Sequence, residues 1–131
     1  MTELVVISLE AWDAVWRRNQ HLVAGLLRAD PAVRVLFAEP AADPLHAART
    51  GRAPRPGQGL VAVDDLTGVG PGRLWRWQPT KWLPRRIDPG ADRRRSRALV
   101  RAVDRLRWSA PVLWINDPGG SSLLHLPSWP A

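Results

Sequence analysis

The apolar positions of this chain fall into short continuous runs separated by segments with helical spacing. Leu4 to Leu9 (LVVISL) is rich in branched residues, which is typical of a strand buried on both faces. Val33 to Ala38 and Val112 to Asn116 have the same character. Leu60 to Val63 and Arg73 to Trp77 are further strand candidates, separated by the turn-rich DDLTGVGPG.

Two longer segments have helical periodicity. Between Asp13 and Ala29, one side of the predicted helix collects Val15, Asn19, Leu22, Val23, Leu26 and Leu27, and Asp30-Pro31 ends it. A second helix is expected after Asp88-Pro89, with an inward stripe formed by Leu99, Ala102, Val103 and Leu106. Residues 41–58 are expected to form a loop or a weak short helix, and DPGGSSLLHL a turn and a further short helix.

Strands that alternate with helices predict an α/β protein, a Rossmann-like three-layer sandwich with a mostly parallel sheet. The 131 residues suit one domain, 1–131, with a conventional core. Ligands of such folds bind beyond the carboxyl ends of the strands. We therefore expect one edge of the sheet to collect four polar segments: residues 10–19, 39–43, 78–81 and 116–122.

Composition narrows the chemistry. There are no cysteines, which excludes disulfides and thiolate chemistry. The three histidines lack metal-ligand spacing, so no metal site is expected. The net charge of +7 is carried almost wholly by arginine. This bias is typical of a GC-rich genome, and the alternative explanation is an anionic partner. No apolar run is long enough to span a membrane, and the run after Arg17-Arg18 is too short for an export signal.

The segment EAWDAVWRRNQHL leads from the first strand into the first helix. A helix amino end offers free N–H groups to an anion, and nearby arginines reinforce that field. Arg17, Arg18, Asn19 and Gln20 are therefore candidate substrate-binding residues. The alternative is a solvated helix face, with two tryptophans filling the core. No G-x-G-x-x-G motif is present, so the ordinary dinucleotide fingerprint is absent.

A second candidate site is NDPGGSS, which follows the last predicted strand and opens a helix. Its candidate substrate-binding residues are Asn116, Asp117, Gly119 and Gly120, because the glycines let a ligand approach the backbone closely. A glycine-rich turn before a helix is also common in proteins without such a ligand. The segment is not a P-loop, because no Gly-Lys-Ser/Thr follows.

Tryptophans and cations alternate in RLWRWQPTKWLPRR, which suits an anionic lipid surface. The candidate membrane-surface residues are Trp75, Trp77, Lys81, Trp82, Arg85 and Arg86. The same pattern suits stacking on nucleic-acid bases, or a core position for Leu74, Trp75 and Trp77. The arginine-rich RRRSRALVRAVDRLR predicts a solvated helix face, with a nucleic-acid patch as the alternative.

Four blocks, SLEAWDAVWRRNQHLVAGLLR, RVLFAEPAADPLH, GRLWRWQPTKWLPRR and PVLWINDPGGSSLL, together resemble the amino-terminal domain of bacterial GT-B fold glycosyltransferases. The likeness is greatest to actinobacterial members of glycosyltransferase family 1 or family 4, including teichuronic-acid-biosynthesis-like ones. It extends over roughly residues 4–131 as a collinear likeness in blocks.

The resemblance implies a function. Such enzymes transfer a sugar, here expected to be a hexosyl group, from a nucleotide-sugar co-substrate across a cleft between two Rossmann-like domains. The first domain binds the acceptor, and neither a metal nor another cofactor is needed. Many members act on lipid-linked or envelope acceptors as peripheral membrane proteins. The implied location is cytoplasmic, at the inner face of the membrane.

The resemblance also implies that the donor-binding, carboxyl-terminal domain is missing from these 131 residues. The chain is therefore expected to be a fragment that is inactive alone, and no catalytic residue can be assigned to it. Two alternatives stay open. One is an arginine-rich nucleic-acid-binding α/β module, although the polar residues of WRRNQHLV need no nucleic acid to explain them. The other is a non-catalytic remnant.

Overall fold

The strands form a twisted sheet in which most neighbours run parallel. The computed structural model describes residues 2–8, 10–51, 53, 56–80 and 91–115. Its strands are β1 (Thr2–Ile7), β2 (Val33–Ala38), β3 (Gly59–Ala62), β4 (Leu74–Gln78) and β5 (Val112–Ile115). Their order across the sheet is β3-β4-β2-β1-β5, and within it β3 alone is antiparallel to its neighbour.

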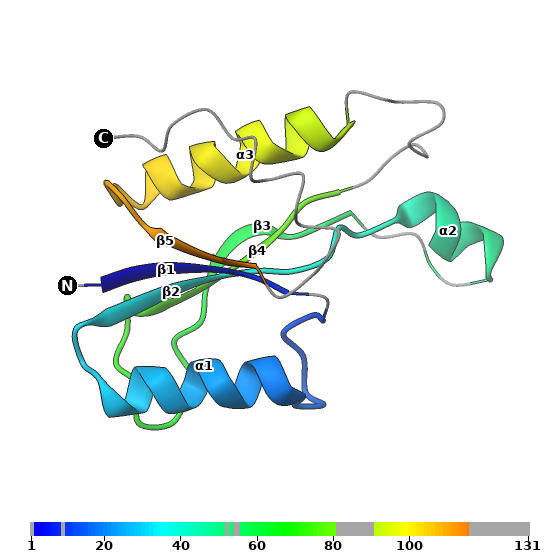
Figure 1. Ribbon diagram of the computed structural model, residues 1–131. Coiled ribbons are helices and arrows are strands. Elements are labelled where there is room, and N and C mark those ends of the chain that lie inside the picture. The colour runs from blue at the N-terminus through cyan, green and yellow to red at the C-terminus, as the bar shows by residue number, and fades with distance from the viewer. Residues whose placement is uncertain (1, 9, 52, 54–55, 81–90, 116–131) are drawn as a thin grey trace.

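Helices cover both faces of this sheet. Helix α1 (Arg18–Ala29) packs on one face and α3 (Ala91–Arg105) on the other, whereas the short α2 (Pro44–Arg49) lies beyond the end of β2 (Figure 1). The predicted α/β class, with three layers and a mostly parallel sheet, is confirmed. None of the helices in the described part of the chain is long and apolar enough to cross a membrane.

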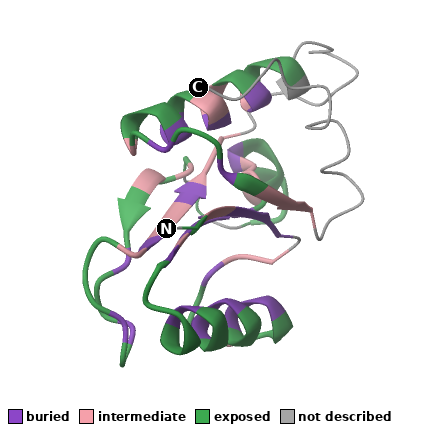
Figure 2. Ribbon diagram, turned by 60° about the vertical axis from the view of Figure 1, so that its left-hand side comes forward, coloured by how far each residue is buried: buried purple, intermediate pink, exposed green. Residues whose placement is uncertain are grey.

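Two apolar clusters hold the layers together. Alternate side chains of a strand point to opposite faces, so each strand contributes to both clusters. The α1-side cluster includes Val6, Val23, Leu27, Phe37 and Leu74. The α3-side cluster includes Val5, Leu36, Leu99, Val103 and Trp108. In Figure 2 the buried residues of both helices lie on the sides turned toward the sheet.

Helix α1 differs from the prediction in its start and its phase. It begins at Arg18 rather than near Asp13, and its buried residues are Asn19, Gln20, Val23, Ala24 and Leu27. Val15, Leu22 and Leu26, for which the periodicity predicts the inward side, are exposed. The reason is that Asn19 and Gln20 hydrogen bond inside the protein, which rotates the helix away from the phase that its leucines indicate.

The other elements agree more closely with the sequence. β2 has the predicted bounds, and the other strands begin or end within two residues of theirs in the described range. Leu99, Ala102 and Val103 are buried as expected, and Leu106 is half-buried. The short helix expected within residues 41–58 is α2, whose first turn is capped by Asp43 Oδ1, 3.0 Å from the His46 N–H. The Asp88-Pro89 helix start lies outside the described residues.

The phase of α1 can be tested with two leucine truncations. Leu27→Ala is expected to lower the free energy of unfolding by about 2–5 kcal/mol, because it opens a cavity in the α1-side cluster. Leu22 is 47% exposed, so Leu22→Ala should change that free energy by about 0.5 kcal/mol or less. Urea denaturation followed by circular dichroism measures both. Equal losses in the two variants would contradict the phase seen here.

Candidate functional site

The order of the parallel strands defines where a ligand would bind. From β1 the chain moves outward through β2 to β4, and then returns to pair β5 with the other side of β1. The order therefore reverses at β1, and crevices at such reversal points are the usual ligand sites of open α/β sheets. At this edge the chain leaves β1 at Ile7 and enters the loop that leads to α1.

The polar segments expected at this edge do gather there, as far as the structure describes them. The chain segments that follow β2 and β4 run side by side: Glu39 N–H donates to Trp77 O, and Ala42 N–H to Pro79 O, both at 2.8 Å. A bridge between Ala42 and Thr80 extends the pairing. The predicted edge is thus confirmed for residues 10–19, 39–43 and 78–80, whereas Lys81 and 116–122 lie outside the described residues.

A buried hydrogen bond joins the end of β1 to the first turn of α1. Ser8 Oγ accepts from Asn19 Nδ2 at 3.0 Å and from the Glu10 N–H at 3.0 Å. Both Ser8 and Asn19 are buried. A buried hydroxyl–amide pair is costly to break, because each group would then be buried without a hydrogen-bond partner and without contact with water. The pair therefore fixes how the loop leaves the sheet.

Gln20 organises the other end of the same loop. Its fully buried side chain donates from Nε2 to Asp13 O at 2.8 Å, and its Oε1 lies 3.4 Å from the Arg17 N–H, which donates to it. Asn19 and Gln20, two of the four residues predicted to bind substrate in this segment, thus have contacts inside the protein. What they do in this structure is hold the loop that ends at Arg17 and leads into Arg18, the first residue of α1.

Arg17 and Arg18 are the exposed members of the segment. Arg17 Nη1 pairs with Asp13 Oδ2 at 3.2 Å, and each side chain of this pair is 43% exposed. Arg18 is the first residue of α1 and is exposed. Both cations therefore lie at the helix amino end, where free backbone N–H groups already favour an anionic or strongly polar ligand.

A buried carboxylate connects this loop to two strands. Glu39, whose side chain is 1% exposed, accepts through Oε1 from the Trp12 N–H at 2.6 Å. The same oxygen accepts from Arg76 Nη2 at 2.8 Å and Nε at 3.1 Å. Arg76 lies on β4 and Glu39 directly follows β2. The guanidinium stabilises a charge that would otherwise be strongly disfavoured in the interior.

Aromatic contacts hold the loop from its apolar side. The Trp12 ring lies edge-on to Phe37, with centroids 5.1 Å apart, and is tilted against Trp16 at 5.5 Å. Trp16 in turn meets the edge of His21 at 5.2 Å. Such tilted and edge-on pairs add to the stabilisation from burial alone. The core role considered for the two tryptophans is confirmed for Trp12, which is buried, whereas Trp16 is half-buried.

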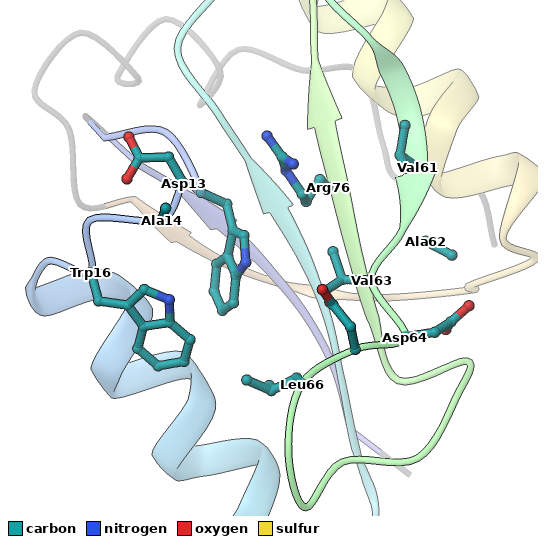
Figure 3. Close-up of a pocket in the computed structure, with 11 residues that line it drawn as sticks. Asp13, Ala14, Trp16, Val61, Ala62, Val63, Asp64, Leu66 and Arg76 are labelled. Atoms are coloured by element: carbon teal, nitrogen blue, oxygen red, sulfur yellow. The ribbon is translucent and has the colours of Figure 1, made fainter.

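A pocket of about 790 Å³ opens between this loop and the strands β3 and β4, on the α1 side of the sheet. Figure 3 shows Trp16 and Leu66 approaching from opposite sides, with Arg76 projecting from β4 toward the loop that carries Asp13. The lining residues are Trp12, Asp13, Ala14, Trp16, residues 61–66 and Arg76. The pocket therefore combines indole rings, carboxylates and a guanidinium.

Glu10 contributes another polar atom to this edge. Glu10 Oε2 is buried and accepts no hydrogen bond within the described residues. Glu10 lies three residues beyond the end of β1, the strand at which the strand order reverses. An unsatisfied buried oxygen is uncommon in native proteins, and a hydroxyl or N–H of a ligand is one group that satisfies it.

The remaining predicted site residues have different outcomes. Trp77 is buried in the α3-side cluster, and the half-buried Trp75 packs against that cluster. The membrane-surface prediction is therefore wrong for Trp77, because side chains alternate between the two faces of the sheet along β4 and that of Trp77 points into the core. The core position for Leu74 is confirmed. The other candidates lie outside the described residues: Lys81, Trp82, Arg85, Arg86, Asn116, Asp117, Gly119 and Gly120.

The arginines of α3 form an exposed row. Arg93, Arg97, Arg101 and Arg105 follow one another at four-residue spacing, and all four are exposed. Residues four apart are neighbours on a helix, so this row places like charges side by side at a small cost in helix stability. Elsewhere, the described residues contain no group of three or more His, Cys, Asp or Glu side chains able to hold a metal ion.

Sequence reasoning missed the Glu39–Arg76 pair, although a signal was present. In LWRWQ, Arg76 shares its strand face with the core residue Leu74. A charged residue on an inward face requires a partner of opposite charge. The register pairs Arg76 with Phe37, two residues before Glu39 and on the same face, so the acidic partner follows once the strands are paired.

The fold and this edge define an α/β protein with a Rossmann-like sheet and a polar loop at the reversal of strand order. Comparisons of the chain with protein-family models, with curated proteins and with solved structures find no match.

The ion pair can be tested by a double-mutant cycle. Arg76→Ala is expected to lower the free energy of unfolding by about 3 kcal/mol, because it leaves the Glu39 carboxylate buried without its cation. Combining it with Glu39→Ala should cost about 1–3 kcal/mol less than the sum of the two single changes. Urea denaturation of the four proteins measures this coupling. Additive losses would mean that the pair does not hold the loop.

Proposed function

We propose that this chain is the amino-terminal, acceptor-side domain of a GT-B type glycosyltransferase. Such an enzyme transfers a sugar from a nucleotide-sugar to an envelope or lipid-linked acceptor. The observation that carries the proposal is the loop of residues 8–17, held by buried polar contacts at the reversal point of a Rossmann-like sheet. The resemblance of four sequence blocks to that family supports it independently.

In this proposal, the domain contributes orientation rather than bond chemistry. The donor nucleotide and its sugar belong to a second α/β domain that faces this edge, and no metal ion is required. The acceptor lies against the edge, where Arg17 and Arg18 attract its polar or anionic groups. Rigid placement of an acceptor hydroxyl lowers the entropic part of the barrier to transfer, so a fixed loop serves the reaction better than a mobile one.

The buried network suits this role. Asn19, Gln20 and Glu39 are each hydrogen bonded to the 8–17 loop or to its start. Their contacts hold the loop before any ligand arrives, so little ordering remains to be done on binding. Glu10 Oε2 is buried and accepts no hydrogen bond among the described residues, which supports a role for this carboxylate in receiving one from an acceptor hydroxyl.

The proposed location is the cytoplasmic face of a membrane, where the enzyme acts as a peripheral protein. The exposed arginine row of α3 supports this, since each cation near an anionic lipid surface contributes about 1 kcal/mol of attraction. The nucleic-acid alternative draws on the same row. Salt-sensitive binding of duplex DNA or RNA, persisting at physiological ionic strength, would favour that alternative.

Transfer activity tests the proposed function directly. The chain is joined to its donor-binding half, as a continuation of the gene or a neighbouring gene product, and assayed with radiolabelled nucleotide-sugars and acceptor extracted in detergent. Arg17→Ala/Arg18→Ala is expected to lower kcat/KM about tenfold or more, because charge-assisted contacts to the acceptor are lost. Fold stability should change by less than about 1 kcal/mol, because the Arg17–Asp13 pair is exposed.

Arg28→Ala is the matched control, since Arg28 is an exposed arginine in the last turn of α1, at the opposite end of that helix from Arg17 and Arg18. Its activity should equal that of the unmodified protein. An assembled protein that transfers no sugar from any nucleotide-sugar would refute the proposed function. Unchanged activity in the Arg17/Arg18 variant would remove these two residues from the acceptor site.

Vesicle sedimentation tests the peripheral location. The chain should bind vesicles that contain anionic phospholipid and not purely zwitterionic ones. Arg97→Ala/Arg101→Ala should weaken binding about tenfold or more, because two cations of about 1 kcal/mol each are removed from the row. Arg17→Ala/Arg18→Ala removes the same charge from another surface and serves as the control. Equal losses in both variants would point to net charge rather than to the α3 row.

A further inference from the structure

The pocket on the α1 side of the sheet lies toward β3 and β4, whereas the strand order reverses at β1. It lies between the 8–17 loop and the segment that runs from β3 into residues 63–66. Helix α1 covers the middle of this face, and the antiparallel β3 at the sheet edge lies beside the pocket (Figures 1 and 3). About 790 Å³ is in the range of pockets that enclose small organic ligands.

The charges of the lining disfavour an anionic ligand. Arg76 is paired with the buried Glu39, and Asp13 is paired with Arg17. This leaves the carboxylates of Asp64 and Asp65, both exposed and both lining the pocket, with no cation paired to them in the described structure. The pocket is therefore acidic although the whole chain is basic. A phosphate or a nucleotide would meet repulsion there.

The guanidinium of Arg76 disfavours a purely cationic ligand. Its Nε and Nη2 donate to Glu39, and no hydrogen bond from Nη1 is present among the described contacts. The side chain remains 26% exposed where it lines the pocket. A guanidinium has only donors, so the group that completes its hydrogen bonds must supply an acceptor. An ammonium ion supplies none, whereas a hydroxyl group supplies one.

The tryptophans supply the apolar part of the site. Trp12 is almost entirely buried and supports Trp16, which is half-buried and lines the pocket. An indole face is a rigid apolar surface with a negative quadrupole, which attracts weakly positive C–H groups. The ligand that fits must therefore combine an apolar C–H face with hydroxyls that both donate and accept.

These properties together describe a sugar ring, and the geometry points to a pocket that binds an uncharged pyranose. Its C–H face stacks on Trp16, its hydroxyls donate to Asp64 or Asp65, and a hydroxyl oxygen accepts from Arg76. This inference rests on the proposed function only in taking the sugar to be part of the acceptor, distal to the group that receives the transferred residue. Sugar binding itself is independent of any transfer reaction.

Nuclear magnetic resonance of the 131-residue chain tests the inference. The probes are the methyl glycosides of glucose, galactose, mannose and N-acetylglucosamine, with glucose 1-phosphate as an anionic probe and glucosamine as a cationic one. At least one neutral glycoside is expected to bind with a dissociation constant of roughly 1 mM, as its few heavy atoms allow. The indole N–H signal of Trp16, assigned with Trp16→Phe, should shift on binding.

Variants separate the contributions of the lining. Trp16→Ala should weaken glycoside binding about three- to tenfold through loss of the stacking surface. Asp64→Asn/Asp65→Asn should also weaken it, and should narrow the preference for the neutral glycoside over glucose 1-phosphate. Asp104→Asn, at an exposed aspartate of α3, is the charge control and should leave both affinities unchanged. Thermal melts confirm that each variant is folded.

Three results would overturn the inference. The first is no binding of any neutral glycoside up to about 50 mM, far above the expected constant. The second is glucosamine binding more than about tenfold tighter than the matching neutral glycoside, which marks a cation site. The third is a shift pattern that spares Trp16. A failed transfer assay with intact glycoside binding would refute the proposed glycosyltransferase and leave this pocket as a sugar site.

Discussion

The Glu39 carboxylate is the contact on which the edge of this protein depends. One oxygen of this buried side chain accepts from the backbone of the 8–17 loop and from a guanidinium on β4. It thereby joins three segments that are distant in the sequence: Trp12, the end of β2 and Arg76. Without the guanidinium, burial of that charge would be unfavourable by several kcal/mol, so loop and strand pairing stabilise each other.

Buried hydrogen bonds also explain the phase of α1. A hydrophobic pattern predicts which helix face is buried only when the polar residues of that helix prefer water. Here Asn19 and Gln20 find partners at Ser8 and Asp13 inside the protein, and their burial displaces Leu22 to the surface. The rotation thus exposes a leucine and buries two amide side chains that position the loop. The spacing of apolar residues alone does not show which of these is favoured.

Much of the fold was predictable because it depends on local patterns. The branched runs gave the strands of the interior, and alternation with helices gave the parallel sheet and the edge where its loops gather. The site was less predictable, since its contacts join residues far apart in the chain: Ser8 with Asn19, and Glu39 with Arg76. Arg17 and Arg18 could be singled out as candidates because two consecutive cations are visible in the sequence without knowledge of pairing. The pocket was not, because its walls come from three separate segments.

The 8–17 loop belongs to both candidate sites, which gives them a physical connection. Its Trp12 and Trp16 line the pocket, while Arg17, at its end, lies at the amino end of α1 and is paired with Asp13, itself a pocket residue. A ligand in the pocket therefore contacts the same short segment that carries the cations of the edge. Because Gln20 and Glu39 hold this segment by hydrogen bonds at Trp12, Asp13 and Arg17, a sugar bound against Trp16 would contact a loop whose conformation is already fixed. An acceptor that reaches both places would be bound at two points of one rigid loop, and rigidity of this kind limits which acceptors fit.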